Sequence, residues 1–184
     1  RSNSAPLSKY SLHPMAQRLS LREYQQNLTE RLKTAEASDA AGSRLGIEAG
    51  GELWLVDLAD AGDVLTLPAL ERVPLTKPWF AGMVHIRGNL YAVVDFSAFL
   101  GAPAAPQSEQ TRVLLIGERH RINSGLLVNR VIGLRRADTM QPRQASAGGA
   151  PWLAKEFVDG DGRIWKLLDV AALVNSPEFL HVEQ

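Results

Sequence analysis

The sequence predicts an all-β protein made of two small β-barrels, with one amphipathic helix ahead of them. Three observations lead to this class. Many short apolar runs are broken by Gly and Pro, which is typical of small barrels. One stretch of 14 residues recurs 74 residues later, so the chain contains an internal repeat. Each copy holds about five strand-like runs, too few for a sandwich of its own.

The N-terminal tail, residues 1–40, contains the predicted helix. The segment Ser20 to Glu23 is a capping box, in which the serine caps the helix and the glutamate reaches back. Apolar residues follow at helical spacing: Leu21, Tyr24, Leu28, Leu32 and Ala35. The pattern predicts a helix over 21–36. Its apolar stripe would pack on the chain's own barrels, which we favour, or on a partner.

The domain that follows, residues 41–184, begins with the first copy of the repeat, about 44–101. Arg44 to Leu58 is typical of two strands joined by a tight turn. The run DVLTL at 63–67 predicts a third strand. The copy ends with GNLYAVVDFSAFLG, residues 88–101, in which an apolar strand is followed by Asp, a short helix and Gly.

The second copy, about 112–175, repeats this order. Arg112 to Asn129 predicts a hairpin that turns at 117–120, and VIGLRR at 131–136 predicts another strand. The copy closes with GRIWKLLDVAALVN at 162–175, which matches the earlier stretch position by position. Polar and Pro-rich segments at 101–110 and 137–152 are predicted as loops.

Asp95 and Asp169 occupy the same place in the two copies, between strand and helix. A catalytic acid would need a partner, and neither copy has one nearby in the sequence. Asp is a preferred N-cap because its carboxylate accepts a hydrogen bond from the first helical turn. We therefore expect two helix caps. Gly101 and Asn175 are expected to end the two helices in a left-handed conformation.

The composition argues against several functions. Lys+Arg and Asp+Glu both number 20, a balance that provides no field for nucleic acid. There is no cysteine, no histidine pair at metal-ligand spacing and no phosphate-binding loop. We therefore expect neither an enzyme nor a cofactor or metal. No apolar run approaches the length of a transmembrane helix, and the start lacks a signal-peptide core, so a cytoplasmic protein is expected.

Two polar segments could be mistaken for ligand sites. DGDGR, from Asp159, begins like a calcium loop but lacks the later ligands, so a hairpin turn is expected. Arg135, Arg136 and Arg143 have no aromatic residue among them, which favours a solvated loop over an oligonucleotide-binding face. Arg87 lies among apolar residues and needs either an acidic partner or access to water.

The segment from Pro78 to Gly101, PWFAGMVHIRGNLYAVVDFSAFLG, resembles the signature of CheW-like domains. The segment SGLLVNRVIGLRR, from Ser124, resembles the second motif of that family. Two positions depart from the family pattern: Asn129 replaces the usual Asp, and Ala92 stands where Pro is common. The resemblance covers about 44–175 and is strongest to the adaptors of type IV pilus (twitching motility) systems.

The resemblance implies a fold of two five-stranded, SH3/OB-like barrels with partly swapped topology. It implies an adaptor that couples a methyl-accepting chemoreceptor to the regulatory domain of a CheA-like histidine kinase at membrane receptor arrays. It also implies that Arg87 pairs with Asp63 and that the receptor lies in an apolar groove. The binding residues it suggests are Asp63, Val64, Met83, Arg87, Gly88, Val113, Gly125, Val128 and Asn129. A flagellar coupling protein of the same family and an oligonucleotide-binding barrel remain as alternatives.

Overall fold

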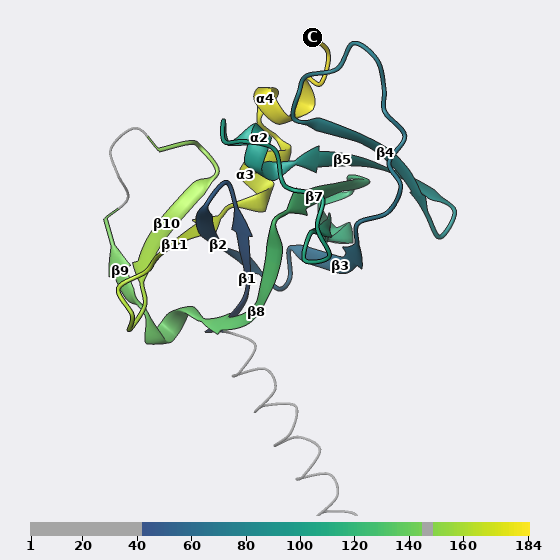
Figure 1. Ribbon diagram of the computed structural model, residues 1–184. Coiled ribbons are helices and arrows are strands. Elements are labelled where there is room, and N and C mark those ends of the chain that lie inside the picture. Colours follow the sequence, from purple (N-terminus) through teal and green to yellow (C-terminus); the bar gives the residue numbers. More distant parts are fainter. Residues whose placement is uncertain (1–41, 145–148) are drawn as a thin grey trace, which may run out of the picture. The chain divides into compact units, whose positions relative to one another are not determined.

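The computed structural model describes residues 42–144 and 149–184, which form two β-sheets with short helices (Figure 1). The helix expected at 21–36 lies outside the described residues. The all-β class predicted from the sequence is confirmed. The sheets have six and five strands, whereas the sequence predicts five in each.

The first sheet has the strand order β8-β1-β2-β11-β10-β9. Its strands are β1 (Ser43–Ala49), β2 (Glu52–Asp57), β8 (Arg130–Arg136), β9 (Gln141–Arg143), β10 (Leu153–Val158) and β11 (Ile164–Leu168). All neighbours are antiparallel except β2 and β11, which run parallel with Trp54 opposite Lys166.

The second sheet has the order β3-β6-β7-β5-β4. Its strands are β3 (Ala61–Thr66), β4 (Phe80–Ile86), β5 (Asn89–Asp95), β6 (Arg112–Ile116) and β7 (Ser124–Val128). Here β5 and β7 form the parallel pair. The connection between β6 and β7 is longer than the turn predicted at 117–120, because a 3-10 turn, η1 (Glu118–His120), is followed by further loop residues.

Both sheets mix strands from the two sequence copies. The hairpin β1–β2 of the first copy pairs with β8 and β11 of the second, and β3 and β5 pair with β6 and β7. The partly swapped topology is therefore confirmed, and the two sheets do not correspond to the two sequence copies. The sixth strand of the first sheet, β9, lies in the segment predicted as a loop. It is an exposed edge strand containing Pro142, so it lacks the alternating apolar pattern that reveals a strand.

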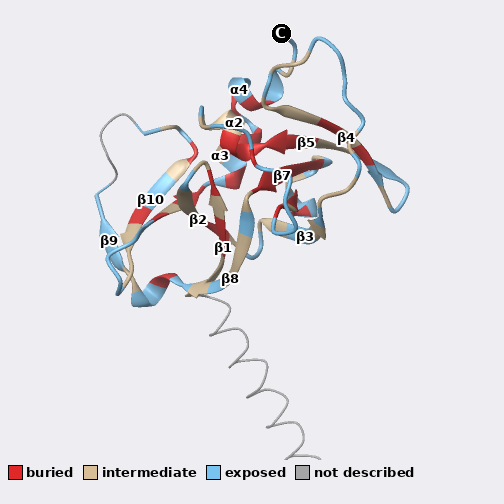
Figure 2. Ribbon diagram, in the orientation of Figure 1, coloured by how far each residue is buried: buried red, intermediate tan, exposed pale blue. Residues whose placement is uncertain are grey.

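The main core joins the two sheets. It contains buried residues from both, among them Ile47 and Trp54 of the first sheet and Leu126 of the second. Figure 2 shows these buried segments at the centre of the described fold. Phe99 lies among four aromatic rings, those of Trp79, Phe96, Trp152 and Phe179, with centroids 5.1–6.5 Å away. The helices α2 (Phe96–Phe99), α3 (Val170–Val174) and α4 (Pro177–Leu180) contribute to this core.

Both predicted helix caps are confirmed. The Asp95 carboxylate accepts a hydrogen bond from the Ala98 amide at 3.1 Å, and Asp169 accepts one from the Ala172 amide at 2.8 Å. The two helices end differently, however. Gly101 has a φ of +81° as expected, but Asn175 is right-handed with a φ of −96°.

The difference at Asn175 has a local cause. The next residue, Ser176, already caps α4 through its hydroxyl, which accepts a hydrogen bond from the Phe179 amide. The Asn175 side chain instead donates to the Ala171 carbonyl at 2.8 Å, which satisfies the end of α3 without a left-handed residue.

Candidate functional site

The site predicted from the sequence centres on an ion pair between Arg87 and Asp63. The Arg87 Nη1 atom lies 2.9 Å from Asp63 Oδ2, so the predicted pairing is confirmed. Both side chains are open to solvent, at 79% and 50% exposure. The pair therefore contributes little to stability and remains accessible to a partner.

Arg87, whose neighbours in the sequence are apolar, lies at a turn and not inside a strand. Ile86 pairs with Asn89, so Arg87 and Gly88 form the two-residue turn between β4 and β5. Both have positive φ, +50° and +86°, as a type I′ hairpin turn requires. The turn places the guanidinium outside the apolar strand. Arg87 therefore does not bury its charge among the apolar residues that surround it in the sequence.

A bulge in β3 positions Asp63. The register of β3 against β6 shifts between Ala61 and Val64. β-Bulges redirect side chains at sheet edges, and β3 is an edge strand. Gly62 at this bulge is tightly packed, since an added Cβ would lie 3.0 Å from the Leu115 carbonyl oxygen. Val64 follows with 41% of its surface exposed, next to the acid.

A cavity of about 430 Å³ lies beside the ion pair. It is lined by the ion pair itself and by residues that include Ile86, Tyr91, Leu115 and Glu118. The lining therefore combines apolar side chains with charged groups. Among residues 42–144 and 149–184, no cluster of three His, Asp or Glu could hold a metal ion.

A histidine near this cavity was not predicted as part of the site. The His120 Nε2 atom lies 2.6 Å from Asp60 Oδ1, and their side chains are only 7% and 12% exposed. The Gly117 amide donates to the Asp60 carbonyl, so η1 is held against the loop between β2 and β3. The two partners are 60 residues apart, and no local pattern marks such a contact.

Three of the predicted binding residues are buried under the surface. Val113 and Val128 have no exposed area, and Gly125 is also buried. An added Cβ on Gly125 would lie 2.8 Å from Val113 Cγ1, so β6 and β7 pack closely here. These buried residues cannot touch a partner themselves. They can affect binding only by holding the exposed residues above them in position. Met83 is half-buried on β4, where its backbone exchanges two hydrogen bonds with Glu71.

Asn129 joins the two sheets. Its Oδ1 accepts a hydrogen bond from the Ser97 hydroxyl at 2.7 Å, and that hydroxyl accepts one from the Gly50 amide at 2.8 Å. The Asn129 amide also donates to the Glu48 carbonyl. The network links the β1–β2 turn of the first sheet to α2 and the end of β7. Ser97 was missed from the sequence, where it is simply one residue of a short helix.

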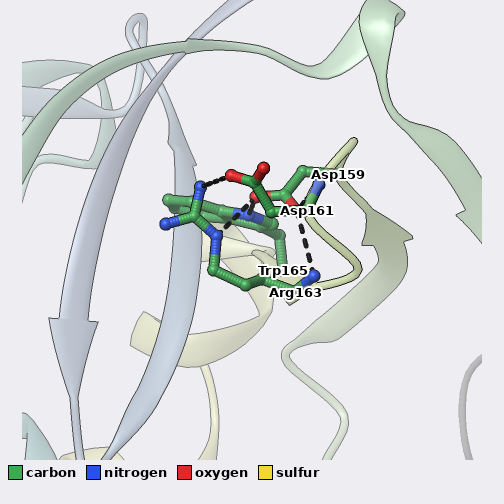
Figure 3. Close-up of polar contacts among 4 residues, drawn as sticks. All are labelled: Asp159, Asp161, Arg163 and Trp165. Atoms are coloured by element: carbon green, nitrogen blue, oxygen red, sulfur yellow. Dashed lines mark hydrogen bonds and ion pairs between the residues drawn. The ribbon is translucent and has the colours of Figure 1, made fainter.

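The segment beginning at Asp159 is a hairpin turn, as predicted. The Asp159 carboxylate accepts hydrogen bonds from the Arg163 amide and the Trp165 indole, at 2.9 and 2.8 Å (Figure 3). The indole bond, followed by the backbone bonds, lowers the pKa of Asp159 to about 2. The carboxylate therefore organises the turn between β10 and β11 as a hydrogen-bond acceptor.

The three arginines favoured for a solvated face lie on strands, two of them on the strand predicted at 131–136 and the third in the segment predicted as a loop. Arg135 and Arg136 belong to β8 and Arg143 to β9. The Arg135 guanidinium lies 5.7 Å from the centre of the Trp165 ring, so it has the aromatic neighbour that its sequence surroundings lacked. Such a contact is a cation–π interaction.

The chain is similar to known proteins in both sequence and fold. The family model of the CheW-like domain matches residues 44–178. Protein PilI of Pseudomonas aeruginosa is 32% identical over 93 residues, which are 50% of this chain and 52% of PilI, so the match spans about half the length of that relative.

A solved structure with a similar fold is the scaffolding protein TtCheW from Thermoanaerobacter tengcongensis. The TM-score is 0.61 at 16% identity, and the match covers 74% of this chain and 94% of the other. This likeness concerns the fold alone. In the described part of the chain, no helix is long and apolar enough to cross a membrane.

Proposed function

Because the chain belongs to the CheW-like domain family, we propose that it is a non-enzymatic adaptor in a chemotaxis-like system. It couples the cytoplasmic tip of a methyl-accepting chemoreceptor to the regulatory domain of a CheA-like histidine kinase. The likeness to PilI supports a type IV pilus system that controls twitching motility. The adaptor acts at the membrane because the receptor recruits it there.

The exposed ion pair beside the cavity is the observation that carries this proposal. Arg87 and Asp63 are 79% and 50% exposed, which leaves polar atoms of both free for a partner. Val64 and Leu90 nearby in the chain keep 41% and 43% of their surface exposed. A charged pair with apolar neighbours suits an amphipathic helix of a partner, whose apolar face is buried while its polar edge sets the register.

A reconstitution experiment tests the proposal. Membranes that carry a pilus-type chemoreceptor are mixed with the kinase and this protein, and co-sedimentation and kinase autophosphorylation are measured. We expect the protein to sediment with the receptor and to be needed for kinase recruitment. Arg87→Glu places two carboxylates together and should weaken assembly while the fold is retained. The exchange of Asp63→Arg with Arg87→Asp should restore part of the binding.

Arg136→Glu is the matched control. It makes the same charge change at another exposed ion pair, that of Arg136 at the end of β8 with Asp138, whose side chains are 53% and 48% exposed, and should leave assembly close to normal. Additive effects of the two single changes at Asp63 and Arg87 would show that the pair does not act as a unit. If the protein instead bound a single-stranded oligonucleotide at low salt and ignored the receptor, the adaptor proposal would be wrong.

A further inference from the structure

The cavity beside the Arg87–Asp63 pair contains one negative charge that the fold does not neutralise. Three charged side chains line this cavity: Asp63, Arg87 and Glu118. Arg87 and Asp63 lie 2.9 Å apart and balance each other. Glu118 is exposed, and among residues 42–144 and 149–184 its carboxylate has no ion-pair partner. The charged lining therefore includes one unpaired carboxylate.

The two basic residues that follow Glu118 in the sequence are bound to a different acid. Arg119 Nε lies 3.2 Å and His120 Nε2 lies 2.6 Å from the same oxygen, Asp60 Oδ1. Neither residue lines the cavity, and Arg121, the next basic residue of this loop, does not line it either. The charge of Glu118 is therefore left uncompensated inside the cavity.

The 3-10 turn that carries Glu118 is fastened to the neighbouring loop. Before Glu118, the Gly117 amide donates a hydrogen bond to the Asp60 carbonyl at 2.8 Å. After it, the contact between His120 and the Asp60 carboxylate is largely buried. Glu118 is therefore presented by a braced turn, and a preorganised group loses less conformational entropy when it binds a partner.

Apolar side chains form another part of the lining, among them Ile86, Tyr91 and Leu115. A long basic side chain combines an apolar stem with a charged end, and an aromatic ring attracts a cation placed over its face. The volume of about 430 Å³ is near the lower end of the roughly 300–1,000 Å³ that is usual for ligand pockets. The cavity therefore suits a single long side chain and not a whole helix.

The charges of the lining favour a basic side chain over an acidic one. An acidic side chain in the cavity would meet two carboxylates, those of Asp63 and Glu118, against the single guanidinium of Arg87. A basic side chain would meet the same three groups with a net attraction. Complementary charge of this kind contributes to specificity between partners.

We infer that the cavity is a subsite for a lysine or arginine side chain of the chemoreceptor helix. Glu118 binds the charged end, and the apolar residues contact the stem. Arg87 and Asp63 stay paired with each other, so Glu118 is the residue that selects a basic side chain. The inference rests on the proposed function for the source of that side chain, but the chemistry of the cavity can be tested without a receptor.

A titration of the ¹⁵N-labelled full chain with N-acetylarginine amide, followed by amide NMR shifts, tests the inference. We expect saturable shifts at Gly62, Gly117 and Glu118, which line the cavity. N-acetylcitrulline amide has nearly the same shape without the charge. It should bind at least about threefold more weakly, the ratio expected for a solvent-exposed ion pair.

Glu118→Gln removes the charge and keeps the size of the side chain. It should reduce the affinity for the arginine probe to that of the citrulline probe, with an unchanged melting temperature because Glu118 is exposed. Glu109→Gln is the matched control, since Glu109 is also an exposed acid in a loop but does not line the cavity. With receptor-bearing membranes, Glu118→Gln should weaken co-sedimentation and Glu109→Gln should not.

Three results would overturn the inference. These are equal binding of the arginine and citrulline probes, stronger binding of N-acetylglutamate amide at the same amides, and equal effects of the two Gln variants. The probe titration and the receptor experiment share only the protein, so their failures can be told apart. Probe binding without receptor sedimentation would refute the adaptor proposal and the receptor as source of the side chain, whereas receptor sedimentation without probe binding would refute the basic subsite alone.

Discussion

The two helix caps of the repeat should contribute unequally to stability, because only one of them has a second task. Asp95 Oδ1 accepts from the Ala98 amide, and Asp95 Oδ2 accepts from the Ala105 amide at 2.8 Å. Asp95 is 5% exposed, and Ala105 is buried. Asp169 is exposed, and its carboxylate accepts the cap bond from the Ala172 amide.

The magnitudes follow from these bonds. Loss of a cap costs about 1 kcal/mol, and we expect Asp169→Ala to destabilise the protein by about that amount. Asp95→Ala loses the same cap and also leaves the buried Ala105 amide without a partner, which costs about 1–3 kcal/mol more. The expected loss for Asp95→Ala is therefore about 2–4 kcal/mol. The sequence alone predicts equal costs at the two positions.

Urea unfolding followed by tryptophan fluorescence measures both losses in the same background. The two substitutions are identical in chemistry and lie at matching positions of the repeat, so each controls for the other. Asp95→Asn should give an intermediate loss, since its single carbonyl oxygen replaces two carboxylate oxygens. Equal losses for Asp95→Ala and Asp169→Ala, at unchanged urea dependence, would refute the reasoning about the second hydrogen bond.

Further predictions concern the ion pair, the Asp159 turn and the bond between the sheets. Removing either partner of the Arg87–Asp63 pair should change the unfolding free energy by less than about 1 kcal/mol, because both side chains are exposed. A larger loss of unfolding free energy in urea would show that the pair stabilises the fold. The pKa of Asp159 is lowered to about 2 from an ordinary 3.8. The ionised carboxylate should therefore stabilise the fold fully above pH 3.8, and this contribution should be lost as the pH falls through 2. Carboxyl ¹³C NMR should give that midpoint, and Trp165→Phe should raise it because the indole is the largest cause; an unchanged midpoint would contradict this. Ser97→Ala should cost about 1–3 kcal/mol, since it breaks hydrogen bonds between the sheets, and calorimetry showing no loss would count against the network.

Local features of this protein could be predicted from its sequence because they depend on neighbouring residues. The first hairpin, the strands ahead of both Asp caps and the turn at Asp159 follow from apolar alternation and turn chemistry. The caps at Asp95 and Asp169 also depend only on neighbouring residues, and both predictions are confirmed. Family resemblance, not pattern, supplied the pairing of Arg87 with Asp63.

Contacts between distant residues were decided by the tertiary structure. The exchange of strands between the two copies, the bond from Asp95 to the Ala105 amide and the link from Ser97 to Asn129 all depend on which strands lie side by side. The same holds for β9, a polar edge strand that forms only because β10 offers it backbone partners. Hydrogen bonds of this kind join residues that no short-range preference connects, so sequence alone determined the segments of this protein and packing determined their partners.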